Sequence, residues 1–280
     1  MVRLGVNLMA WSGQVDVGLF PRIARLGYDG VELPLLAPDA VDASAVRRAL
    51  AEAGLRCTAS GALPPKASLL DPARRQRAVN WIDNCLACAA ACGAEVLCGP
   101  FCAPVGELVG RGPTDAERES CLASLRALAD RARARGVVLA IEVLNRFETY
   151  FMNTAADAVA LIDAVDSPWV GAHLDTFHMN VEEKSVPAAL RLVGRRLAHM
   201  HFSENDRGVV GSGHVDWPGV RAALRDAGYL ASDRWIVAET FAGGVPEIAA
   251  ATAIWRPLVP DPWTYARESL RFMKALLEEE

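Results

Sequence analysis

Short, continuously apolar stretches alternate with amphipathic segments along the whole chain. An unbroken apolar run is typical of a strand buried on both faces, whereas a strand with one wet face alternates apolar and polar residues. We therefore predict buried strands, each bounded by polar or glycine-containing turns. The predicted strands cover residues 4–9, 30–36, 55–63, 95–101, 137–144, 170–176, 197–202 and 235–240.

Amphipathic helices are predicted between these strands. Their ends carry recognisable signals, because glycine favours the residue after a helix and Thr-x-x-Glu forms a capping box at its start. Thr114 and Glu117 make such a box, and Gly136 follows the same helix. The predicted helices cover residues 17–26, 42–53, 72–92, 114–135, 154–165, 186–193, 217–227 and 264–277.

The regular alternation of strand and helix predicts an α/β fold with a parallel sheet covered by helices. Eight such units favour a closed (β/α)8 TIM barrel, and the first strand lacks the glycine-rich fingerprint of an open dinucleotide-binding sheet. No linker or break in composition divides the chain, so one domain over residues 1–280 is expected. Two long connections, 102–113 and 242–263, each follow a strand, so we expect both at the active-site face of the barrel.

Composition and charge narrow the function classes. The 280 residues are 52% hydrophobic with a formal net charge of −5, which disfavours a nucleic-acid surface or a polybasic membrane patch. No apolar run of about 18 residues exists, so no membrane span is expected. Residues 1–12 read as a strand instead of a secretory leader, and the seven cysteines are an odd number. We therefore expect a cytoplasmic protein with reduced thiols.

A polar residue occurs at the end of each of the last four predicted strands, at regular spacing. Glu142, Asp175, His201 and Glu239 are separated by 33, 26 and 38 residues, about one strand–helix unit each. In a closed barrel their side chains would converge at the carboxyl ends of the strands. Any one of them alone could be a hydrogen-bonded strand-end residue. Together, three carboxylates and one imidazole predict a site for Mn²⁺, Mg²⁺ or Co²⁺, since structural zinc favours thiolates.

A second group of polar residues lies in the loops just after these strands. Glu148, His178 and Arg207 could bind a hydroxylated ligand, with Arg207 as a permanently charged donor. The alternative for Glu148 and Arg207 is a surface salt bridge. Trp11 and Phe241 either form an apolar wall for a substrate or simply pack in the core.

Other conspicuous residues have structural interpretations. Glu32 ends the second predicted strand, and it either reaches the pocket or supports the fold. His173 and His199 each lie two residues before a candidate ligand, so we expect them deeper in the barrel interior. Three cysteines recur on one helix face, as core positions do; they are Cys85, Cys88 and Cys92.

Four segments of the second half resemble the ketose 3-epimerases. They are AIEVLNRFET (140–149), HLDTFHMNVEE (173–183), HMHFSENDRG (199–208) and VAETF (237–241). The opening GVNLMAWS (5–12) and the late IWRPL (254–258) are also similar. This family contains the D-tagatose, D-allulose (psicose) and L-ribulose 3-epimerases and belongs to the xylose isomerase-like barrels.

The resemblance implies roles for the candidate residues. Glu142, Asp175, His201 and Glu239 would be the metal ligands, and Glu142 and Glu239 would also be the catalytic carboxylates. Residues expected to bind the sugar are Glu148, His178 and Arg207. One divalent ion is implied, with Mn²⁺ expected and Co²⁺ or Mg²⁺ as alternatives, and a homodimer or homotetramer is expected. Asn7 departs from the family, where aromatic residues often line the pocket, so the preferred sugar stays open.

The implied reaction is the C3 epimerisation of a free ketose through a metal-stabilised enediolate. Two carboxylates on opposite faces of C3 would remove the proton and return it. The alternatives are an aldose–ketose isomerase on the same barrel and an apurinic endonuclease of the same superfamily. The endonuclease needs histidines on early strands, and this chain has no histidine before His173. A catalytically inactive sugar-binding protein is disfavoured because both candidate glutamates are present.

Overall fold

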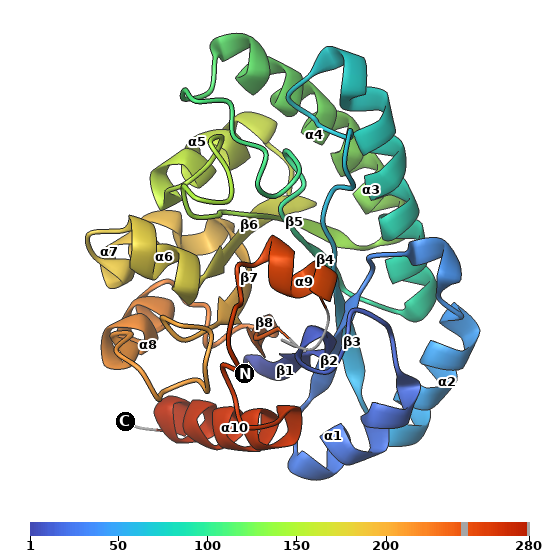
Figure 1. The fold of residues 1–280 in the computed structure, drawn as a ribbon, viewed down its shortest axis with the longest axis vertical. Coiled ribbons are helices and arrows are strands. Elements are labelled where there is room, and N and C mark those ends of the chain that lie inside the picture. Colours follow the sequence, from blue (N-terminus) through green and yellow to red (C-terminus); the bar gives the residue numbers. More distant parts are fainter. Residues whose placement is uncertain (242–245, 279–280) are drawn as a thin grey trace.

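The computed structural model of the protein describes residues 1–241 and 246–278. Within these residues, eight parallel strands close into a barrel in chain order, with β1 paired to both β2 and β8. This confirms the predicted (β/α)8 architecture (Figure 1). The strands are β1 (Arg3–Asn7), β2 (Gly30–Pro34), β3 (Arg56–Ser60), β4 (Val96–Gly99), β5 (Val138–Glu142), β6 (Val170–Asp175), β7 (Leu197–Phe202) and β8 (Trp235–Ala238).

Most helices surround the barrel, whereas α9 lies over one end of it, as Figure 1 shows. The capping box of Thr114 and Glu117 is formed at the start of α4, and Gly136 ends that helix at a φ of 67°, so these end signals are confirmed. The helices are α1 (Phe20–Leu26), α2 (Ala43–Ala53), α3 (Pro72–Cys92), α4 (Asp115–Arg135), α5 (Ala155–Val165), α6 (Thr176–Glu182), α7 (Val186–Val193), α8 (Trp217–Asp226), α9 (Pro246–Ala251) and α10 (Pro262–Glu278).

Two helices were not predicted from the sequence. The short helix α6 begins directly after β6, because the Asp175 carboxylate accepts a hydrogen bond from the Phe177 backbone N–H (2.7 Å) and caps it. Helix α9 lies inside the connection predicted at 242–263, of which residues 242–245 fall outside the described residues. The helix predicted from Val17 begins at Phe20, since Val17–Leu19 form a 3₁₀ turn.

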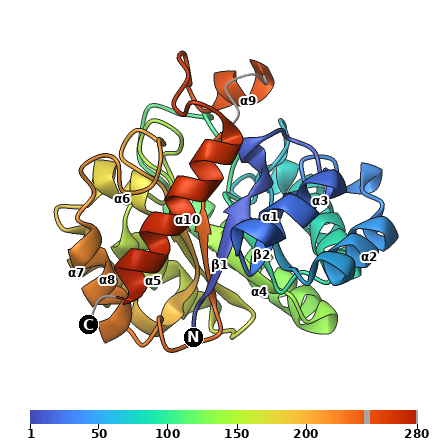
Figure 2. The ribbon, with the colours of Figure 1, turned by 90° about the horizontal axis from the view of Figure 1, so that it is seen from below.

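The strands all point toward one end of the molecule. Figure 2 shows the chain beginning and ending at one end of the barrel, with α9 at the opposite end. Because β1 runs away from the N-terminus and the strands are parallel, their carboxyl ends lie on the side of α9. None of the helices in the described part of the chain has the length and apolarity that crossing a bilayer requires.

Apolar side chains of the strands and helices form the core around the barrel, whereas polar side chains lie in the barrel interior. Side chains such as Leu33, Ile82 and Leu125 are fully buried in the apolar core of strand and helix residues. Polar residues of the strands are buried as well. Asn7, Glu32, Thr58, His173, His199 and His201 are each at most 1% exposed. A buried polar group is costly unless it is hydrogen-bonded or charge-paired. We therefore expect these buried polar residues to have specific partners and a specific role.

Candidate active site

The four side chains predicted as metal ligands meet at the carboxyl ends of four neighbouring strands. Glu142 and Asp175 are the last residues of β5 and β6, His201 lies near the end of β7, and Glu239 directly follows β8. One ligand atom from each side chain lies within 4.8 Å of the others. This is a compact set of three carboxylates and one imidazole, which we call the ligand cluster.

The carboxylates of the ligand cluster repel one another, and this repulsion and their burial shift their pKa values. Burial and the neighbouring charge of Glu239 raise the pKa of Glu142 well above its usual range. Burial also raises the pKa of Asp175, to about 6, against the opposing effect of Arg207. Burial acts the same way on Glu239, but the charges of His201 and Arg207 outweigh it and hold its pKa at about 2. A divalent cation among these carboxylates would relieve their repulsion, so the residues present fit such an ion.

Arg207 lies beside the ligand cluster and is buried, with 4% exposure. Its Nη1 is 2.8 Å from Oε2 of Glu239 and 3.2 Å from Oδ2 of Asp175. The guanidinium also packs over the rings of Phe177 and Phe241, at 4.2 and 4.6 Å from their centroids. The alternative of a surface salt bridge is therefore wrong for Arg207, since Arg207 and both of its carboxylate partners are buried.

His178 and Glu148 lie next to the ligand cluster and are connected through Asn145. The Nε2 atom of His178 is 3.6 Å from Oε1 of Glu142 and 3.1 Å from Nη2 of Arg207. The Asn145 backbone N–H donates to Nδ1 of His178 (3.2 Å), and the Asn145 side-chain amide donates to Glu148 (2.8 Å). Asn145 is thus a further site residue, in addition to the candidates named from the sequence.

A cavity of about 720 Å³ opens above the ligand cluster. Glu142, His201 and Glu239 form part of its floor. The side chains of Glu148, His178, Arg207 and Phe241 also line it, together with Met9, Leu36, Leu63, Pro104 and Val105. This volume lies within the range usual for small-molecule sites. The predicted connection 102–113 reaches the site, because its residues Pro104–Glu107 are among the lining residues.

Trp11 takes a different position from Phe241. Its ring packs edge-to-face against Trp263, with the centroids 4.9 Å apart. It is not among the described residues that line the cavity. Of the two aromatic residues proposed as a substrate wall, Phe241 therefore faces the cavity, and Trp11 packs against Trp263 in the first turn of α10.

Comparisons with known proteins agree with this geometry. The family described as Xylose isomerase-like TIM barrel matches residues 20–276. An L-ribulose 3-epimerase of Methylomonas sp. (strain DH-1) is 32% identical over 98% of this chain and 97% of its own. A D-psicose 3-epimerase of Enterocloster bolteae is 33% identical, covering 86% of this chain and 81% of its own.

A solved structure gives the same result. The D-allulose 3-epimerase of Methylomonas sp., crystallised in complex with D-allulose, superposes with a TM-score of 0.90 at 31% identity. The superposition covers 98% of this chain and 96% of that one. Enzymes with these names belong to the isomerase class. The chain therefore belongs to the ketose 3-epimerase family of the xylose isomerase-like TIM barrels.

Proposed function

We propose that this protein is a metal-dependent enzyme that inverts the configuration at C3 of free ketoses. The substrate pairs we propose are L-ribulose and L-xylulose, D-allulose and D-fructose, and D-tagatose and D-sorbose. The observation that carries the proposal is the ligand cluster, in which Glu142 and Glu239 reach the same small space from β5 and from the end of β8. The names of the relatives support the same reaction.

The ligand cluster would hold one divalent ion, for which we propose Mn²⁺, with Co²⁺ and Mg²⁺ as alternatives. When bound, the ion would polarise the ketone and stabilise the negative charge that develops on the sugar oxygens. Arg207 lies against Glu239 and Asp175, so its charge orients these carboxylates and offers donors to a sugar hydroxyl. His178 and Glu148 line the same cavity and would bind further hydroxyl groups.

The protein's own part in the reaction is proton transfer at C3. One glutamate takes the proton from C3 on one face of the sugar, and an enediolate forms. The other glutamate, which starts protonated, delivers its proton to the opposite face and so inverts the centre; proton exchange with solvent then restores both glutamates. The roles of Glu142 and Glu239 exchange with the configuration of C3, because each serves one face. Apolar side chains such as Leu63 and Val105 line the cavity and limit the access of water.

The first test is incubation of the protein with L-ribulose, D-allulose and D-tagatose in deuterated water containing Mn²⁺. The proposal expects the C3 epimer of at least one sugar, with one deuterium at C3. An aldose as the main product, with or without deuterium, would identify an aldose–ketose isomerase and refute the epimerase. Phosphorylated ketoses belong in the same panel as a comparison.

The second test is the substitution Glu239→Gln, which keeps the size of the side chain and removes its capacity to carry the proton. The rate should fall by about 10²–10⁴-fold, the usual contribution of an acid–base residue. The matched control is Glu117→Gln, because Glu117 lies at the start of α4 and does not line the cavity. Deuterium exchange at C3 at the wild-type rate in Glu239→Gln would refute the two-carboxylate mechanism.

A further inference from the structure

Glu32 lies directly beneath the ligand cluster, in the polar interior of the barrel. It belongs to β2 and has no solvent exposure. Five side chains from other strands lie around its two carboxylate oxygens. Around Oε1 are Nε2 of His201 (2.8 Å) and Nδ2 of Asn7 (2.9 Å); around Oε2 are Nε2 of His199 (2.7 Å), Oγ1 of Thr58 (2.9 Å) and Sγ of Cys98 (3.3 Å).

The two ring nitrogens of His201 face different partners. Nε2 is at hydrogen-bond distance from the Glu32 carboxylate, and Nδ1 lies 3.2 Å from Oε1 of Glu239, inside the ligand cluster. An ionised carboxylate only accepts hydrogen bonds, so Nε2 must carry the proton of this contact. Nδ1 is then the nitrogen whose lone pair can bind a metal ion.

We propose that Glu32 is a positioning residue that fixes the tautomer and the ring orientation of His201 for metal binding. This inference rests on the proposed function, since it concerns the same metal site. A ligating histidine commonly donates its second N–H to a carboxylate or a carbonyl, which orients the ring and makes it a stronger ligand. Here the carboxylate comes from β2, on the far side of the barrel interior from β7.

Asn7 extends this arrangement to a catalytic residue. Its Nδ2 is 2.9 Å from Oε1 of Glu32 and 3.1 Å from Oε1 of Glu239. Its Oδ1 accepts a hydrogen bond from the Met9 backbone N–H (2.9 Å), which holds the amide in place. Glu32 therefore acts on the ligand cluster along two routes, directly through His201 and through Asn7 to Glu239.

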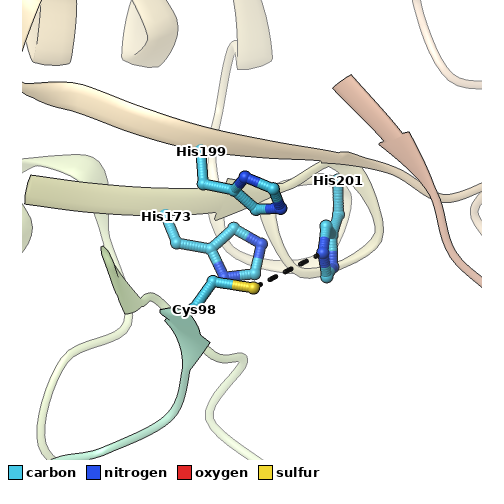
Figure 3. A group of neighbouring side chains, drawn as sticks. All are labelled: Cys98, His173, His199 and His201. Carbon is cyan, nitrogen blue, oxygen red and sulfur yellow. Dashed lines mark hydrogen bonds between the residues drawn. The ribbon is translucent and has the colours of Figure 1, made fainter. Parts of the chain in front are cut away.

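The same interior contains a group that could suggest a second metal site. Cys98, His173, His199 and His201 each place a ligand atom within 4.8 Å of the others, and Figure 3 shows the three rings and the thiol facing one another. Zinc favours such nitrogen and sulfur ligands. However, Nε2 of His199, Nε2 of His201 and the Cys98 thiol all lie at hydrogen-bond distance from Glu32. We therefore place the Glu32 carboxylate, and no second ion, at the centre of this group.

The direct test is the protonation of His201 in the unmutated protein. The chain has five histidines, so a ¹⁵N NMR spectrum of labelled imidazoles is simple enough to assign with a His201→Asn variant. We expect Nε2 of His201 to be protonated in the metal-free protein and in the protein loaded with diamagnetic Mg²⁺. A bare Nε2 in the loaded protein would overturn the proposal.

Metal affinity gives the second test. Glu32→Gln should bind Mn²⁺ about 10–100-fold more weakly than the wild type, as is usual when a partner of a ligating histidine is changed. Thr58→Val is the matched control, because it removes a different neighbour of Glu32 and leaves the contact between Glu32 and His201. It should keep one ion per chain. Unchanged affinity in Glu32→Gln, with normal binding by the wild type, would refute this role alone.

Two further outcomes are decisive. Two ions per wild-type chain, with one lost in Cys98→Ala, would assign the interior to a second metal and overturn the role of Glu32. A wild type that binds no divalent ion would refute the proposed function, and this role with it. If Glu32→Gln fails to fold, as judged by circular dichroism, the NMR measurement on the wild type still decides the question.

Discussion

The two halves of the barrel place polar residues at the ends of their strands in different ways. In the second half, the side chains form the ligand cluster of Glu142, Asp175, His201 and Glu239. Glu142, His201 and Glu239 also line the cavity. In the first half, each strand supplies one residue to a group centred on Glu32: Asn7, Glu32, Thr58 and Cys98. In the proposed function, the second half would supply the metal ligands, and the first half would hold them in place.

The chemistry of the two halves explains this division. The second half places three carboxylates together where a cation can enter from the cavity, and a bound cation would offset their mutual repulsion. The four residues of the first-half group are buried, and Glu32 is the only carboxylate among these four. His199 and His201 outweigh the effect of burial and hold the pKa of Glu32 well below its usual range. A single buried anion is stable there because both oxygens are hydrogen-bonded.

The largest effect that separates the two halves should come from Asp175→Asn. Asp175 is a candidate ligand without a role in proton transfer, so its loss should weaken metal binding and activity together. We expect a loss larger than the 10–100-fold typical of a residue that supports a ligand. Asparagine keeps the oxygen that caps α6 for the Phe177 N–H, so the fold should persist. Wild-type Mn²⁺ affinity, measured by calorimetry, would contradict this assignment.

A smaller effect is expected from the supporting half. Asn7→Leu removes the donor shared by Glu32 and Glu239, and kcat should fall about 10-fold, at the lower end for a supporting residue. Thr58→Val is the control, because Thr58 donates to Glu32 but has no bond to Glu239. Steady-state kinetics should therefore give a lower kcat for Asn7→Leu than for Thr58→Val. Equal rates in both variants would show that the link to Glu239 is unimportant.

The smallest effect concerns the stability of the protein and comes from Glu117, which belongs to neither the ligand cluster nor the group centred on Glu32. The hydrogen bond from Arg111, helped by Thr114 and Tyr150, lowers the pKa of Glu117 against the effect of burial. A lowered folded-state pKa stabilises the protein above the ordinary pKa of glutamate, about 4.3, and this stabilisation is lost as the pH falls below it. Glu117→Gln should cost roughly 0.5 kcal/mol at pH 7.

Denaturation with urea at several pH values checks this sign. The difference between wild type and Glu117→Gln should shrink as the pH falls from 6 to 3, whereas epimerase activity at neutral pH should be unchanged. A difference that grows in acid would mean that Glu117 is not stabilised as an anion. A loss of activity would place the start of α4 in the site after all.

The periodicity of the chain was a good guide to the fold, because buried parallel strands leave unbroken apolar runs. It failed at α6, where the helix starts at Thr176, directly after the residue that ends the strand. There, Asp175 lies at the end of β6 and also caps the helix, and a pattern of hydrophobicity contains no signal for such a double use. The sequence also did not determine the burial of Arg207, since an arginine in a polar loop usually faces solvent.

By itself, the sequence determined the alternation of strands and helices and the spacing that brings four strand ends into step. These are local properties, set by which residues avoid water and by the length of each unit. Only the tertiary structure decided which polar residues meet. Glu32 and His201 are 169 residues apart, and their contact depends on the closure of the barrel. No local pattern encodes a distance across a barrel, because that distance is fixed by the packing of all eight strands in the described chain.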